Sequence, residues 1–201
     1  ANTEEFTTTI YSPIAATWAS GGALNTARNQ SVGVGLQTAS IAFAGFNGTA
    51  RVANAEEYNG SSWTEVGDLN TARGALAGAG TQDAAIGFGG STNPSTNVAL
   101  TESWNGSSWS EVGDLNTARF NLSGFGTSTA AIAVGGSAPS VTESWNGSSW
   151  TAVNNLNSTR GNLASAGVQT AALAFGGNPS TTASESWDGT SWTVTNALPA
   201  A

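Results

Sequence analysis

The residues of this chain that could do chemistry are arginines and carboxylates, and both recur at regular spacing. Four of the five arginines follow a tryptophan by ten positions, and they are Arg28, Arg73, Arg119 and Arg160. Two copies of a Glu-Val-Gly-Asp stretch supply paired carboxylates, Glu65 with Asp68 and Glu111 with Asp114. Paired carboxylates can hydrolyse glycosidic bonds, but their repetition at equivalent positions favours a structural or solvated role. A glycosidase-like enzyme is therefore the least favoured interpretation.

The composition argues against most other catalytic and metal chemistry. The sequence has no histidine, cysteine, lysine or methionine. General bases at neutral pH are most often histidines, and metal sites of the Cys/His type need side chains that this chain lacks. The glycine pairs do not form a phosphate-binding loop of the P-loop type, because that motif includes a lysine. We therefore expect a protein that is not an enzyme and that uses no cofactor and no metal.

The charge and hydrophobicity of the chain limit the classes of partner that it can bind. The formal net charge is -8, and charged residues make up only 9% of the chain while hydrophobic ones make up 39%. Phosphate backbones are bound through basic patches, so we expect no nucleic-acid partner. No apolar run approaches the ~20 residues that span a bilayer, so we expect no membrane insertion. The surface must consist mostly of Ser, Thr, Asn and Gly, which favours a virion or extracellular location.

Repeated β-strands are the elements expected to position the arginines. The stretch Glu-Ser-Trp-Asn-Gly-Ser-Ser-Trp at 102–109 has close copies at 57–63, 143–150 and 185–192. Each repeated arginine precedes a glycine by 17 positions, at Gly45, Gly90, Gly136 and Gly177. Large and small apolar residues alternate before these glycines, and an Asn-Gly or Asp-Gly pair separates the two aromatic runs. Each unit is predicted to hold four short strands, with helix nearly absent.

The repeats also divide the chain. We expect one domain over 1–201, with full units at about 24–68, 69–114, 115–155 and 156–201 and a partial unit at 1–23. The distance from the glycine to the next aromatic residue varies between units. Length variation at one place in a repeat indicates surface loops, here at 46–55, 91–100, 137–141 and 178–183. We expect the recurring tryptophans to pack between neighbouring units.

The glycine-ended strand, the Glu-x-aromatic strand, the following tryptophan and the Leu-x-x-x-Arg stretch together resemble the Kelch repeat. The resemblance implies an all-β fold, a β-propeller of four-stranded Kelch-like blades with four complete blades and an N-terminal partial blade, a five-bladed ring being favoured over four. The units are shorter than the ~50 residues usual for Kelch, and the family's tyrosine is present only as Tyr58. The Trp-Asn-Gly-Ser-Ser-Trp variety is also similar to repeats in structural and tail proteins of marine bacteriophages. That similarity implies other virion or surface subunits as partners.

Two sets of residues are candidate binding sites. The four repeated arginines should ring one mouth of a propeller channel, and the resemblance to Kelch adaptors implies acidic peptides as their ligands. The alternative is that each arginine pairs with a neighbouring carboxylate and caps backbone carbonyls. The second set lies on the variable loops and offers amides suited to hydroxyl-rich ligands, at Asn47, Asn93, Asn97 and Asn178.

The favoured function is a non-enzymatic structural or binding module on a virion or cell surface. It would mediate assembly or attachment to glycan or protein, with a host-surface glycan as one expected ligand. An adaptor for acidic peptides is the alternative. Residues 1–23 supply candidates for only a third and a fourth strand, and an unpaired sheet edge recruits strands from other chains. We therefore expect self-association through this N-terminal partial blade.

Overall fold

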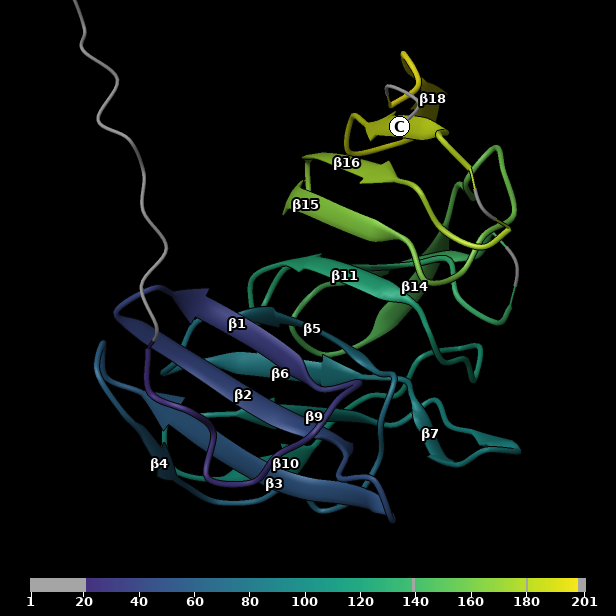
Figure 1. The fold of residues 1–201 in the computed structure, drawn as a ribbon. Helices are drawn as coiled ribbons and strands as arrows, with labels where there is room; N and C mark the ends of the chain where they lie inside the picture. Colours follow the sequence, from purple (N-terminus) through teal and green to yellow (C-terminus); the bar gives the residue numbers. More distant parts are fainter. Residues whose placement is uncertain (1–20, 139, 180, 199–201) are drawn as a thin grey trace, which may run out of the picture.

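The computed structural model describes residues 21–138, 140–179 and 181–198 of the chain. The described residues contain β-strands and no helix, which confirms the all-β prediction. Sixteen strands form four four-stranded antiparallel sheets, and a small hairpin lies beside them (Figure 1). The arrangement is consistent with propeller-like blades, and residues 1–20 of the predicted partial blade lie outside the described part.

Each sheet follows one repeat unit along the chain. The first sheet consists of β1 (Val32–Leu36), β2 (Ala39–Phe46), β3 (Arg51–Tyr58) and β4 (Trp63–Glu65). The second consists of β5 (Ala77–Gly80), β6 (Ala85–Phe88), β9 (Thr101–Trp104) and β10 (Trp109–Glu111). The third consists of β11 (Ser123–Gly126), β12 (Ala131–Val134), β13 (Thr142–Trp145) and β14 (Trp150–Val153). The fourth consists of β15 (Ala164–Val168), β16 (Ala171–Phe175), β17 (Ser184–Trp187) and β18 (Trp192–Val194). The small hairpin is separate and consists of β7 (Ser91–Asn93) and β8 (Thr96–Asn97).

The Asn-Gly and Asp-Gly pairs close hairpins between the third and fourth strands, as predicted. In the third sheet Trp145 pairs with Trp150 across the two strands. The side-chain Oδ1 of Asn146 accepts hydrogen bonds from the backbone N–H groups of Ser148 and Ser149, at 3.0 and 2.9 Å. A positive φ of 94° at Gly147 completes the turn, and glycine adopts that conformation without steric cost.

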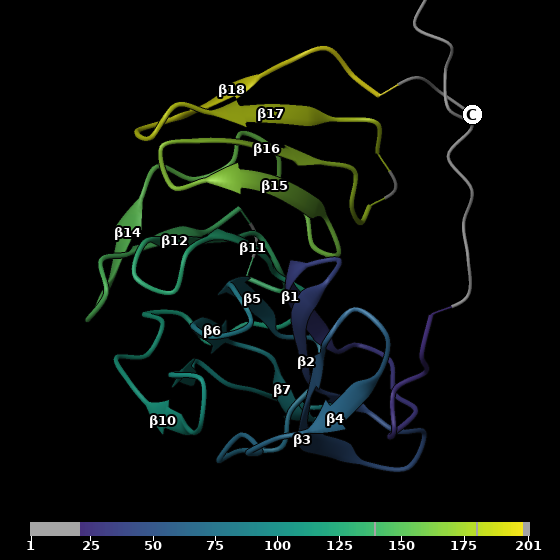
Figure 2. The same ribbon diagram turned by 90° about the vertical axis from the view of Figure 1, so that its left-hand side faces the viewer.

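The first strands of the four sheets gather at the centre of the molecule (Figures 1 and 2). β1 lies beside β5, β5 beside β11, and β11 beside β15. A chain of backbone hydrogen bonds joins the residues that lead into these strands: Ala75 donates to Gln30 at 3.0 Å, Asn121 to Ala75 at 2.8 Å and Asn162 to Asn121 at 2.8 Å. Among the described residues, no backbone hydrogen bond returns from Asn162 to Gln30. The four sheets are thus linked in series.

Neighbouring sheets pack through one recurring interface. The second strand of each sheet supplies two apolar side chains, and the next sheet covers them with a pair of tryptophans from its third and fourth strands. Phe43 and Trp109, for example, have ring centroids 4.7 Å apart. The pairs are Ile41 and Phe43 against Trp104 and Trp109, Ile86 and Phe88 against Trp145 and Trp150, and Ile132 and Val134 against Trp187 and Trp192. These contacts confirm that the tryptophans pack between units.

The two end sheets lack this cover in the described structure. Leu173 of β16 occupies the position of Ile41, Ile86 and Ile132, yet it is 46% exposed while all three isoleucines are 0% exposed. Leu198 follows β18 and is 42% exposed, whereas its counterparts Leu69, Leu115 and Leu156 are 4% exposed. At the other end, the aromatic pair of the first sheet, Tyr58 and Trp63, is only half-buried. Among the described residues, the interface therefore has one half at each end that no other sheet covers.

Candidate functional site

The side chains of the four repeated arginines are buried. Each guanidinium forms an ion pair with the glutamate of the Glu-x-aromatic strand in its own sheet, at N–O distances of 2.8 to 3.2 Å. The side chains of both partners are at most 1% exposed. The pairs are Arg28 with Glu56, Arg73 with Glu102, Arg119 with Glu143 and Arg160 with Glu185.

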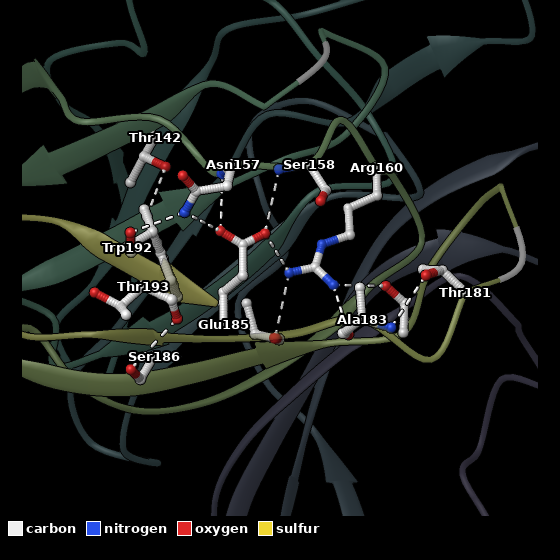
Figure 3. Close-up of polar contacts among 12 residues, drawn as sticks. Thr142, Asn157, Ser158, Arg160, Thr181, Ala183, Glu185, Ser186, Trp192 and Thr193 are labelled. Atoms are coloured by element: carbon white, nitrogen blue, oxygen red, sulfur yellow. Dashed lines mark hydrogen bonds and ion pairs between the residues drawn. The ribbon is translucent and has the colours of Figure 1, made fainter. Parts of the chain in front are cut away.

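Figure 3 shows this cluster around Glu185 in the fourth sheet. One carboxylate oxygen, Oε1, accepts from Nη2 of Arg160 at 2.8 Å. The other, Oε2, accepts from the backbone N–H and the side-chain amide of Asn157, at 2.8 and 2.9 Å. Arg160 also donates to the carbonyls of Ala183 and Gly176. The repeated Leu-Asn-x-x-Arg stretch therefore fastens the segment that leads into each sheet to that sheet's outer strands.

This environment fixes the electrostatics of the buried pair. Burial lowers the pKa of the Arg119 guanidinium to about 10, and the charge of Glu143 opposes this shift. The guanidinium stays protonated at neutral pH, as a buried arginine with a carboxylate partner must to avoid leaving an unpaired charge. In the described structure the arginines have the pairing with carboxylates and carbonyls that was the alternative interpretation. A ligand could reach them only if the sheet opened, so their binding role stays a prediction.

A small hollow of about 270 Å³ lies at the centre, where the four inner strands begin. Four of the residues that line it have left-handed backbone with φ of 51° to 56°, and two of these four are asparagines, Asn121 and Asn162. Asparagine tolerates that region better than most residues. The complete lining is Gln30, Ser31, Ala75, Leu76, Asn121, Leu122, Asn162 and Leu163. The lining thus consists of amide, hydroxyl and apolar side chains and includes none of the four repeated arginines.

A larger cavity, of about 540 Å³, lies between two hairpins in the first two variable segments. We call it the hairpin pocket. The first hairpin is the extended end of β2 and β3, and the second is the β7–β8 hairpin, which projects from the body of the molecule in Figure 1. The lining is Gln30, Phe46, Thr49, Ala50, Arg51, Thr92, Asn93 and Pro94. It contains no carboxylate, although the chain as a whole is acidic.

Arg51 is the one cation of this pocket. Its guanidinium carbon lies 5.3 Å from the centroid of the Phe46 ring, within the range of a cation–π contact. Nη1 donates to the side-chain oxygen of Gln30, and Nη2 donates to Oγ of Ser91 at 3.2 Å. Within the described part of the chain, no carboxylate lies within 4.0 Å of this guanidinium, unlike the four repeated arginines.

The sequence pattern did not identify Arg51 as a candidate binding residue. It is the fifth arginine, and it differs from the others because it does not follow a tryptophan by ten positions. Its place in a variable segment was the signal that could have identified it. A rare cation outside the repeat pattern and inside a loop of variable length is a candidate for function, since loops on a rigid scaffold often carry binding residues.

The four predicted asparagines are all exposed, and the structure does not bring them together in one site. Asn93 lines the hairpin pocket. Asn47 uses Oδ1 to accept from the backbone N–H groups of Thr49 and Ala50, so it shapes the tip of the first hairpin. Asn97 donates to Oγ of Ser137 at 3.4 Å, towards the third sheet. Asn178 forms an isolated backbone bridge with Gly161 in the fourth unit, outside the strands of the fourth sheet.

The repeated carboxylates that were weighed for glycoside hydrolysis are apart from this pocket. Asp114 Oδ1 accepts from the backbone N–H of Thr101 at 2.9 Å, and Asp68 Oδ1 accepts from Ala55 in the same way at 3.2 Å. Glu65 and Glu111 are exposed on β4 and β10. These placements agree with the structural or solvated roles expected for them.

The described residues contain neither a metal-binding cluster nor a membrane-spanning helix. No group of three or more His, Cys, Asp or Glu side chains in the described ranges is placed to hold a metal ion. In those same ranges there is also no helix with the length and apolarity needed to cross a membrane. A comparison with protein-family models gives no match, and a comparison with curated proteins gives no significant match.

Proposed function

We propose that this chain is a non-enzymatic binding module that attaches to a glycan or a protein through its variable loops. The observation that supports this most directly is the hairpin pocket. Its volume of about 540 Å³ falls within the range of small-ligand sites. All but one of its lining residues come from two of the four variable segments, 46–55 and 91–100.

The chemistry of the lining supports a polar ligand. Thr49, Thr92 and Asn93 offer hydroxyl and amide groups, and Phe46 and Pro94 offer apolar surface. This mixture suits hydroxyl-rich ligands such as glycans. Acidic peptides are the second candidate, and the half-buried Arg51 is the observation that favours them. A virion or cell-surface location remains part of the proposal and rests on the resemblance to Kelch-type and bacteriophage repeats.

The test is an exchange of the pocket hairpins. Segments 47–50 and 92–97 are replaced by Gly-Ser linkers, and the variant is compared with the intact chain on glycan and peptide arrays. We expect the intact chain to bind at least one ligand class and the variant to lose that binding. The control exchanges residues 60–62, in the β3–β4 turn that does not line the pocket. Equal binding by the intact chain and the hairpin variant would overturn the assignment.

Assembly is the other part of the proposed function. Leu173, Phe175 and Leu198 of the fourth sheet stand at positions that the next sheet covers elsewhere in the chain. The half-buried Tyr58 and Trp63 are the complementary half of that same interface. We propose that the fourth sheet packs against the first sheet of a second copy of the chain. The role expected for the N-terminal partial blade, and closure of a five-bladed ring, involve residues outside the described part and belong to this proposal.

A further inference from the structure

The hairpin pocket concentrates positive charge in an acidic protein. The chain has a formal net charge of -8, and the pocket lining contributes one arginine and no carboxylate. The repeated arginines are neutralised by glutamates at 2.8 to 3.2 Å, and in the described residues Arg51 has no such partner. The guanidinium of Arg51 is therefore the group in the pocket that would attract an anion.

The guanidinium is also held in place before any ligand arrives. Gln30 and Ser91 accept hydrogen bonds from Nη1 and Nη2, and the Phe46 ring lies against it. Gly74 leaves the room for this placement, because a Cβ added there would lie 2.7 Å from Nη1. A guanidinium has five N–H donors, so donors remain after these two contacts. An arginine fixed by packing loses little conformational freedom when it binds a carboxylate.

The remaining lining narrows the ligand class. Arginine matches the planar geometry of a carboxylate and can bind it through two parallel hydrogen bonds. Phe46 and Pro94 provide surface for the apolar face of a sugar ring, while Thr49, Thr92 and Asn93 can hydrogen-bond to its hydroxyls. A multiply acidic peptide fits less well, because the pocket has a single cation and the net charge of the chain would repel further carboxylates.

We propose that the hairpin pocket binds a sugar acid, a uronic or sialic acid unit, with its carboxylate on Arg51 and its ring between the two hairpins. This inference rests on the proposed function, namely binding through the variable loops, and adds the class of ligand and the residue that selects it.

The experiment compares two sugars that differ in the carboxylate. Binding of glucuronic acid and of glucose, as their methyl glycosides, is measured by ligand-observed NMR and calorimetry, with N-acetylneuraminic acid as a second acid. We expect at least one acid to bind the intact chain, with glucose at least tenfold weaker. Arg51→Gln should lower the affinity for the acid by at least tenfold, and Arg51→Lys should lose less. Thr96→Ala, at an exposed position of the β7–β8 hairpin that is outside the lining, is the control and should bind like the intact chain.

The outcomes separate this inference from the function on which it rests. Equal affinity for glucuronic acid and glucose, unchanged binding in Arg51→Gln, or no binding of either acid would each overturn the sugar-acid assignment. If the arrays still show binding that depends on the hairpins, the loop-binding function stands and only the ligand class is wrong. Circular dichroism of Arg51→Gln and of the intact chain should give the same spectrum. A loss of binding by the folded variant then reports on the pocket.

Discussion

The indole Nε1 of Trp150 donates a hydrogen bond to Oγ1 of Thr101, 49 residues earlier in the chain, at 3.1 Å. Trp192 donates to Thr142 in the same way, again at 3.1 Å. In the first interface the buried Nε1 of Trp109 has no partner among the described residues, because Ala55 stands where the second and third units have Thr101 and Thr142. The interface between the first two sheets therefore contains an unsatisfied donor that the other two lack.

Ala55→Thr should supply the missing acceptor. One intramolecular hydrogen bond makes a net contribution to stability of about 0.5–1.5 kcal/mol. We therefore expect the free energy of unfolding of Ala55→Thr to exceed that of Ala55→Val by about 1 kcal/mol. The valine variant is the matched control, since it has the same shape without the hydroxyl. Urea denaturation of both variants measures the difference. Equal stability of the two variants would show that the donor at Trp109 has no cost.

Arg119→Met should strongly destabilise the chain, because it leaves the carboxylate of Glu143 buried without its cation. Removing one partner of a buried ion pair typically costs about 3–5 kcal/mol. Adding Glu143→Gln should recover part of that loss, so a double-mutant cycle in urea should give a favourable coupling energy. Arg51→Met is the control, and a change of about 0.5 kcal/mol is expected for a half-exposed arginine with no ion pair. Additive effects of the two substitutions would argue against coupling within the pair.

Glu57 should make the stability depend on pH. Burial, the largest effect, raises the pKa of Glu57; the Trp104 indole lowers it and the nearby Asp83 raises it further. The folded state then binds the proton more tightly, so the free energy of unfolding falls as pH rises from the ordinary glutamate pKa, about 4.3, through the raised value.

Serine stands at the position of Glu57 in the other three units, at Ser103, Ser144 and Ser186. Glu57→Ser should therefore gain stability relative to the parent chain at pH 7 and much less at pH 4. Denaturation at the two pH values measures this gain. Glu65→Ser removes an exposed carboxylate from β4 and is the control. A gain of equal size at both pH values would contradict the assignment to proton binding.

Leu173→Ser should prevent association between copies. Leu173 is 46% exposed, so the substitution removes apolar surface from the uncovered face without opening a core cavity. We expect the parent chain to gain mass with concentration in sedimentation or light scattering, and the variant to stay monomeric. Leu36→Ser is the control, because Leu36 is 71% exposed at the end of β1, away from the interface positions. A parent chain that is monomeric at every concentration would rule out the proposed interface.

The repeat pattern by itself determined the local structure of this protein. Alternating apolar residues predicted the strands, and the Asn-Gly pairs predicted the hairpins, because both signals depend on residues close in sequence. The four-stranded sheets followed, since each strand pairs with a neighbour along the chain. The fixed arginine offset placed an arginine at the same position of each unit, although it left open whether the arginine binds a ligand or pairs with a carboxylate.

The tertiary structure decided what depends on distant residues. The burial of Arg160 against Glu185 follows from contacts across 25 positions, and the spacing alone left a surface role open. Arg51 became a candidate binding residue only from the tertiary structure, in which it lies between two hairpins of different length. The sequence could not predict this placement, because irregular insertions have no period from which their conformation follows. Leu173 stands at a repeat position that is buried in the other three units. It is exposed because no neighbouring sheet covers it in the described structure. Burial is a property of the assembly, and a repeat pattern specifies which face needs a partner without specifying which partner covers it.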